Sequence, residues 1–142
     1  SKARRNRGNE KGCTMYPTDR KYTREHEWAL ADGGVCTVGI TAFAAEQLGD
    51  VTFVELPQTG NNVNAGDAIS AVESVKAASD VYTPVGGTVS ETNAALEAQP
   101  ELVNESPHDQ GWFFKVTGYD ASALDALMDA AAYEKYIKEL EG

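Results

Sequence analysis

The sequence predicts a mostly-β domain, a compact sandwich or barrel with one short internal helix and a helical C-terminus. Three observations support this fold class. Short segments of alternating apolar residues recur along the chain, and glycine or proline separates most of them. One interior stretch, residues 42–48, has a helical pattern, and the C-terminal region has another. A chain of 142 residues is also long enough to bury a core without disulfides.

The predicted strands are short and are rich in β-branched and aromatic residues. They span residues 23–30, 35–40, 51–56, 68–72, 80–83, 88–91 and 111–117. Asp32-Gly33-Gly34 predicts a turn that joins the first two strands as a hairpin. Pro57 ends the third strand. The core aromatic residues predicted from this pattern are Tyr82, Trp112, Phe113 and Phe114.

Helix signals are local and fewer. Thr41 is a suitable N-cap for a helix over residues 42–48, and Gly49 is a suitable stop. Residues 93–107 look irregular, with one helical turn at 100–103 because proline suits a first helical position. Residues 122–128 are predicted to be helical, and Asp129 caps a last helix. Its apolar stripe consists of Tyr133, Tyr136, Ile137 and Leu140.

Composition separates a tail from the body. Residues 1–15 are interpreted as a disordered basic tail or a cloning remnant, and residues 16–142 as one domain.

The formal net charge of −10 argues against nucleic acid or an anionic membrane as partner. No apolar run approaches the ~18 residues of a membrane span. Cys13 and Cys36 match no metal or redox spacing and are expected to be free thiols. We expect a monomer in the bacterial cytoplasm, or in the mitochondrial matrix or another organelle if the source is eukaryotic.

Lys76 is the only lysine or arginine between Arg24 and Lys115. The alternating segments 68–72 and 80–83 flank it, which predicts a hairpin with Val75 and Lys76 at its tip. No glycine or asparagine is present there, so a type I turn is favoured over the primed turns, and it would direct the lysine outward. The amine is either the target of an enzyme that acylates one chosen lysine or an ordinary solvated surface lysine.

The segment Glu73-Ser-Val-Lys-Ala-Ala-Ser-Asp80 resembles the lipoyl-attachment segment of the glycine cleavage system H-proteins. The resemblance runs from about Tyr16 to Leu140, in order and spacing. It includes His26-Glu-Trp28, Val38-Gly-Ile-Thr41, Leu48-Gly-Asp-Val51, Phe53-Val-Glu-Leu-Pro57, Pro84-Val-Gly-Gly87, Leu102-Val-Asn104, Ser106-Pro107 and Gly111-Trp112. Lipoyl domains of 2-oxoacid dehydrogenases typically show Asp-Lys-Ala and biotin carriers Met-Lys-Met, so Val75-Lys76-Ala77 favours the H-protein.

The resemblance implies a barrel-sandwich hybrid, like a lipoyl domain, with lipoate in amide linkage on Lys76. It implies a shuttle with no active site of its own, which carries an aminomethyl group between enzymes. The implied partners are a pyridoxal-phosphate glycine decarboxylase (P-protein), an aminomethyltransferase (T-protein) and dihydrolipoamide dehydrogenase (L-protein). A lipoate ligase or a lipoyl/octanoyl transferase would attach the cofactor.

By the same resemblance, Glu27 and Asp80 are the positions that would shelter the aminomethyl-lipoyl arm. Each has a plainer interpretation: Glu27 as a solvated strand carboxylate, and Asp80 as an acceptor of backbone N–H groups at the turn. His26 is interpreted as a packed or surface histidine rather than a proton shuttle. Some family members have a histidine where this chain has Gln47, which leaves any role of that imidazole open.

Three other functions compete. A lipoyl-relay carrier, which supplies lipoyl groups to other proteins, would share the fold and the lysine. An unmodified interaction domain would keep the fold without the cofactor. A standalone enzyme is disfavoured because the sequence shows no nucleophile–base pair, metal-ligand set or phosphate loop.

Overall fold

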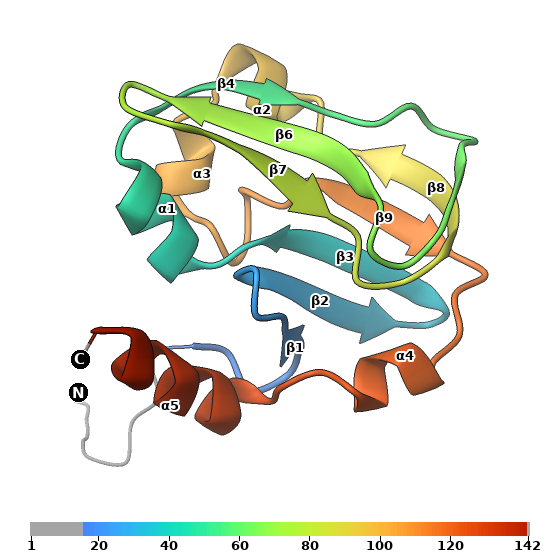
Figure 1. The fold of residues 1–142 in the computed structure, drawn as a ribbon. Coiled ribbons are helices and arrows are strands. Elements are labelled where there is room, and N and C mark those ends of the chain that lie inside the picture. The colour runs from blue at the N-terminus through green and yellow to red at the C-terminus, as the bar shows by residue number, and fades with distance from the viewer. Residues whose placement is uncertain (1–15, 142) are drawn as a thin grey trace.

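The computed structural model describes residues 16–141, so the predicted tail lies outside the described residues. Two antiparallel sheets form the fold, and Figure 1 shows the smaller one above β3 and β9 of the larger one. The larger sheet has the order β1-β2-β3-β9-β8-β5. Its strands are β1 (Lys21–Tyr22), β2 (Glu27–Asp32), β3 (Val35–Ile40), β9 (Phe114–Thr117), β8 (Gly87–Thr92) and β5 (Asn62–Val63).

The smaller sheet consists of β4 (Val51–Glu55), β6 (Ala68–Ser74) and β7 (Ala78–Tyr82), in the order β4-β6-β7. It contains the predicted lysine hairpin, since β6 pairs with β7 from Ala68↔Tyr82 to Glu73↔Ala78. The predicted mostly-β sandwich is therefore confirmed.

The space between the sheets is filled mainly by valines. Val38, Val72, Val81 and Val116, one from each of four strands, are almost fully buried. Alternate side chains of a strand point to the same face, so one inward residue in two is enough to build this core. Phe113 and Phe114 are also fully buried, as predicted, whereas Tyr82 is 37% exposed and is not a core residue.

A second cluster joins the C-terminal helix to the larger sheet. Helix α5 (Ala130–Glu141) places Tyr133 in a stack with Tyr22, with ring centroids 4.9 Å apart. Trp28 and Ile137 are buried in the same cluster. The predicted apolar stripe ends there, because Leu140 is 52% exposed on the last turn of α5, beyond the cluster.

Three shorter helices lie between strands: α1 (Ala42–Leu48), α2 (Ala95–Ala98) and α3 (Leu102–Glu105). A fourth, α4 (Ser122–Asp125), lies between β9 and α5. Helix α1 has the predicted bounds, with the Thr41 side chain accepting from Ala44 N. The sequence did not predict α2, β1 or β5, and the helix predicted over residues 122–128 ends at Asp125. Within residues 16–141, no helix combines the length and apolar character that a membrane crossing needs.

Two predicted strands are shorter than expected. The first begins at Glu27 instead of residue 23, because Thr23 and His26 form a tight turn and His26 has φ +71°. The last begins at Phe114 instead of residue 111, because Gly111 packs against the carbonyl groups of Leu102 and Ser106.

Candidate functional site

The tip of the β6–β7 hairpin is a four-residue turn held by one side chain. Ser74 N donates to Ala77 O (2.8 Å), and Ser74 Oγ accepts from Lys76 N (3.3 Å) and Ala77 N (3.1 Å). Neither Val75 nor Lys76 has a positive φ, which excludes the primed turns, as expected. Lys76 is exposed at the tip, so its amine is accessible to a modifying enzyme.

A second loop fixes the position of this tip. Val75 N donates to Asp50 O (3.1 Å), and a Cβ at Gly49 would lie 3.3 Å from Lys76 Cε. The loop is itself held by α3, where the Asn104 side chain donates to Gly49 O (2.7 Å) and accepts from Val51 N (2.8 Å). The lysine side chain therefore lies against the C-terminal end of α1.

A cavity of about 260 Å³ lies between α1, the start of β2 and the hairpin. We call it the hairpin pocket. Its lining comprises Glu25, His26, Glu27, Ile40, Phe43, Ala44, Gln47, Leu48, Val72, Ser79, Asp80 and Val81. The fold thus brings both predicted shelter residues, Glu27 and Asp80, to one cavity beside the lysine. Its walls are largely apolar, and its carboxylates can hold a cation.

Glu27 is the buried acid of this cavity. Only 2% of its surface is exposed, so the interpretation as a solvated carboxylate is wrong. Thr23 Oγ1 donates to Oε1 (2.8 Å), and Tyr82 N donates to Oε2 (2.9 Å). Burial outweighs these two hydrogen bonds and raises the pKa of Glu27 to about 7. A cation that enters the pocket would favour the ionised form.

Glu27 also separates two cavities. A second cavity, of about 270 Å³, lies on the other side of it, next to Tyr82, Pro84 and Met128. The exposed ring of Tyr82 lines this second cavity, which accounts for its absence from the core.

Asp80 lies in a different environment from Glu27. It is exposed, and its carboxylate accepts no hydrogen bond from the residues that the structure describes. The interpretation as an acceptor of backbone N–H groups at the turn is therefore wrong. Asp80 keeps its full capacity to accept hydrogen bonds from a cation in the hairpin pocket.

The structure adds residues to the site that sequence reasoning missed. His26 is packed, as expected: Nδ1 lies 2.8 Å from the Tyr133 hydroxyl, and the ring lies 4.6 Å from that of Phe43. Tyr133 was predicted only as part of the apolar stripe of the last helix, Phe43 only as part of the helix over residues 42–48, and Thr23 only as part of a strand. The Thr23–Glu27 hydrogen bond is local and depends on the turn at His26, whereas Tyr133 and Phe43 reach His26 from segments far apart in the chain, which no spacing signal indicates.

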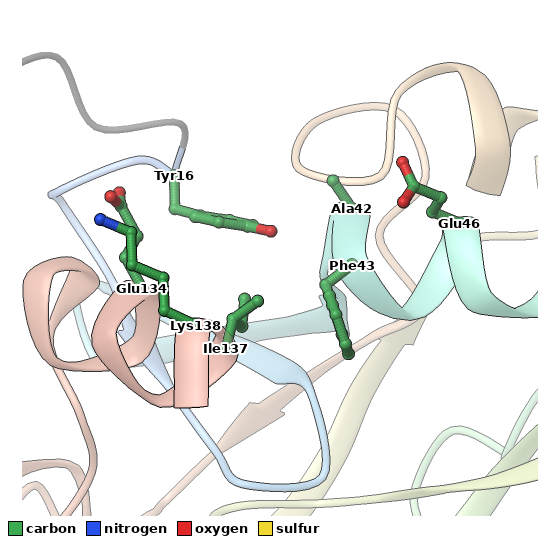
Figure 2. A pocket seen from close by; sticks show the side chains of 7 residues that line it. All are labelled: Tyr16, Ala42, Phe43, Glu46, Glu134, Ile137 and Lys138. Atoms are coloured by element: carbon green, nitrogen blue, oxygen red, sulfur yellow. The ribbon is translucent and has the colours of Figure 1, made fainter. Parts of the chain in front are cut away.

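A separate pocket of about 190 Å³ lies between α1 and α5, and Figure 2 shows its lining. Apolar groups from Tyr16, Phe43 and Ile137 line this pocket, and the carboxylates of Glu46 and Glu134 lie on its opposite sides. Phe43 lines both this pocket and the hairpin pocket. The ring of Phe43, on α1, therefore forms part of the wall of both cavities.

Comparison with known proteins relates this arrangement to one family. The family model described as "Glycine cleavage H-protein" matches residues 20–140. A glycine cleavage system H protein from Phenylobacterium zucineum is 58% identical over 117 residues, which cover 82% of this chain and 97% of that protein. One from Thermus thermophilus is 50% identical over 122 residues, 86% of this chain and 95% of that protein.

A solved structure agrees with the sequence comparisons. The crystal structure of a glycine cleavage system H protein from Mycobacterium marinum matches with a TM-score of 0.77 at 36% identity. The match covers 89% of this chain and 100% of that one. The two-sheet fold with its helices is therefore shared with this protein.

Proposed function

The chain belongs to the glycine cleavage H-protein family, whose members are the lipoyl-bearing shuttles of the glycine cleavage system, and we propose that its lipoyl group is attached to Lys76. One observation supports this site most strongly: Lys76 is exposed at the tip of a hairpin turn that Ser74 and the Gly49–Val51 loop hold in place. An enzyme that modifies a single lysine needs both the exposure and the rigid frame.

The residues around the hairpin fit a lipoyl arm. When bound, the lipoyl group supplies a dithiolane on a hydrocarbon chain, which can take up an aminomethyl group at sulfur and exchange electrons. Apolar side chains of the hairpin pocket, including those of Phe43, Leu48 and Val72, match the hydrocarbon part. The lysine side chain lies against Gly49, which directly follows Leu48 in the wall of that pocket. The pocket is therefore within reach of an arm on Lys76.

Glu27 and Asp80 are proposed to hold the cargo. An aminomethyl group carries a protonated amine, which a water-excluding site can keep only if an anion accompanies it. Glu27 supplies a buried carboxyl held in one orientation by Thr23 and Tyr82, and Asp80 supplies an exposed one at the entrance. In this proposal Glu27 and Asp80 only bind and shelter the cargo. We therefore propose a carrier without catalysis of its own.

As a component of the glycine cleavage system, the chain works with the other components. We propose glycine decarboxylase, aminomethyltransferase and dihydrolipoamide dehydrogenase as its specific partners, with a lipoate ligase or a lipoyl/octanoyl transferase for its modification. The net charge of −10 supports docking on basic rims of these enzymes. The bacterial sources of the relatives support the bacterial cytoplasm as its compartment.

Coexpression with a lipoate ligase tests the attachment site. The intact mass should increase by one lipoyl group, peptide mapping should place it on Lys76, and the loaded protein should support glycine–CO2 exchange with glycine decarboxylase. Lys115→Arg is the matched control and should be modified like the wild type. A lipoyl group on another lysine, or an unmodified chain, would refute the proposal. Loaded protein that supports no exchange would instead indicate a lipoyl relay.

A further inference from the structure

Two hydroxyl groups and one imidazole form a short chain of hydrogen bonds next to the hairpin pocket. Thr41, the N-cap of α1, places Oγ1 2.7 Å from the hydroxyl of Tyr133 on α5. The same hydroxyl lies 2.8 Å from Nδ1 of His26, in the turn before β2. Within residues 16–141, His26 is the only residue other than glycine with a positive φ. The backbone thus pays a conformational cost to direct this imidazole toward α5.

The positions of the protons follow from counting donors and acceptors. Thr41 is fully buried, and its oxygen already accepts from Ala44 N. The remaining group in contact with that oxygen is the Tyr133 hydroxyl, so the Thr41 proton is donated to Tyr133 Oη. The Tyr133 proton is then donated to His26 Nδ1. The reverse direction would leave the buried Thr41 proton without an acceptor, which is strongly disfavoured.

His26 therefore has one tautomer. Burial lowers the pKa of His26, so the ring is neutral near pH 7. Since Nδ1 accepts a hydrogen bond, the single ring proton is on Nε2. This makes His26 an N–H donor through Nε2 and not an acceptor for an amine. It also argues against a proton shuttle.

His26 lines the hairpin pocket, and its Nε2 has no hydrogen-bond partner among the described residues. The only side-chain polar atom of the described residues that is both buried and unpartnered is Glu134 Oε2. His26 Nε2 is therefore not fully buried and is reachable from solvent. A donor without a protein acceptor is thus available where the arm is proposed to lie.

The positions of His26 and Lys76 along α1 indicate which atom of a lipoyl arm would accept a hydrogen bond from His26. His26 contacts Phe43 in the first turn of α1, whereas Lys76 lies against Gly49 at its end. At 1.5 Å per residue these points are about 9 Å apart. The amide carbonyl of a lipoyl arm would stay next to Lys76, and its sulfur atoms would be at the far end, near His26.

We propose that His26 is a fixed hydrogen-bond donor to a sulfur of the lipoyl arm, and that Tyr133 is the positioning residue that sets its tautomer. The proposal rests on attachment of the arm at Lys76. In this proposal, the acceptors and the donor of the pocket bind different parts of the loaded arm. The carboxylates of Glu27 and Asp80 hold the amine of the cargo, and the Nε2–H group of His26 holds the sulfur that carries no amine.

The tautomer is tested in the unmodified full-length protein, where the result does not depend on lipoylation. Nitrogen-15 NMR of the imidazole should show a protonated Nε2 and an unprotonated Nδ1 for His26 between pH 7 and 8. Tyr133→Phe removes the donor to Nδ1 and should give a mixture of tautomers. Tyr136→Phe is the matched control: its ring also lies near His26, but its hydroxyl donates to Arg24 O, so the spectrum should not change. A wild-type His26 protonated on Nδ1 would overturn the proposal.

The contact with the arm is tested on protein loaded with the aminomethyl group, with the lifetime of the cargo measured by intact mass. His26→Asn keeps a residue that tolerates a positive φ, but its amide is too short to replace Nε2. We expect it to shorten the lifetime about tenfold, a loss of roughly one hydrogen bond to a charged or polarisable group. Tyr133→Phe should shorten it about threefold and Tyr136→Phe not at all.

These results separate the inference from the proposed function. A lifetime in His26→Asn equal to that of the wild type, with Lys76 fully lipoylated, would overturn the contact and leave the shuttle intact. A wild-type chain that cannot be lipoylated on Lys76 would refute the proposed function, and the contact with it.

Discussion

In the proposed function, the hairpin tip and the wall of the hairpin pocket formed by His26 and Glu27 contribute by opposite physical means. The tip is exposed, and Ser74, two residues before the lysine, holds the turn through its own side chain. In the wall, Glu27 is buried and His26 half-buried, and they are held by groups as distant in the chain as Tyr82 and Tyr133. Presenting a residue needs local geometry, whereas sheltering a cargo needs a network that the whole fold assembles. Substitutions at the tip should therefore change function alone, and substitutions in the wall should change function and stability together.

The largest effect is expected at the tip, from Lys76→Arg. A guanidinium cannot be lipoylated, so transfer of the aminomethyl group should fall to background. The free energy of unfolding should stay within about 0.5 kcal/mol of the wild type, because the side chain is exposed. Intact mass, glycine–CO2 exchange and urea unfolding measure the three quantities. A marked loss of stability would show that Lys76 also supports the fold, which would contradict the expectation that substitutions at the tip change function alone.

The next effect is expected in the wall, from Glu27→Gln. The pKa of Glu27 is raised from 4.5 to about 7, so the folded state binds a proton that the unfolded state releases. The contribution of Glu27 is therefore most favourable below pH 4.5 and is lost as the pH rises through 7. The loss is up to about 3 kcal/mol. Glutamine remains neutral and can still accept from Tyr82 N.

Urea unfolding of the wild type and Glu27→Gln at pH 5 and pH 8 measures this effect. The variant should gain stability relative to the wild type as the pH rises, although it should lose the cargo faster. A stability difference that is the same at both pH values would show that the carboxyl is not held in a buried, proton-binding site.

A smaller effect is expected where the two regions meet, from Gly49→Ala. Gly49 has φ 78° and ψ −154°, a region that only glycine populates readily, so alanine should cost about 2 kcal/mol. The new Cβ would also lie 3.3 Å from Lys76 Cε and displace the lysine, which should slow lipoylation. Gly33→Ala is the control, with φ 60° and no atom within 4 Å of its Cβ. Equal lipoylation rates in both variants would show that the loop does not position the lysine.

The smallest effect is expected from Asp80→Asn. Asp80 is exposed and accepts no hydrogen bond from the described residues, so stability should stay within about 0.5 kcal/mol of the wild type. The lifetime of the aminomethyl cargo should fall about threefold, since one of the three carboxylates that line the pocket (Glu25, Glu27 and Asp80) is removed. Asp50→Asn provides the comparison: this exposed acid is near the tip but does not line the hairpin pocket. Equal lifetimes in the two variants would remove Asp80 from the site.

The same contrast explains how much could be predicted from the sequence. Helix α1 was predicted to the residue and the hairpin strands to within two residues, because their signals are local: a threonine cap, a glycine stop and alternating strands around Val75 and Lys76. The shelter residues Glu27 and Asp80 were named through a family resemblance, and the structure brings them to one cavity. The shelter itself stays a proposal.

What could not be predicted depends on hydrogen bonds between polar side chains, some of them local and some between distant segments. Thr23 was predicted to lie in a strand, but its hydroxyl binds Glu27 and the chain turns at His26. Tyr133 was predicted as one residue of an apolar stripe, and its hydroxyl gave no signal of a partner more than a hundred residues away. Periodicity reports which face of an element is apolar, not which polar atoms meet across the fold.

Amide chemical shifts of three forms of the protein test the central claim most directly: unmodified, lipoylated, and loaded with the aminomethyl group. We predict that lipoylation changes mainly the shifts of residues 74–77. Loading should then change those of Glu27, Phe43 and Asp80, as the arm moves from the tip into the hairpin pocket. Changes that stay confined to the tip after loading would contradict the claim that the wall shelters what the hairpin presents.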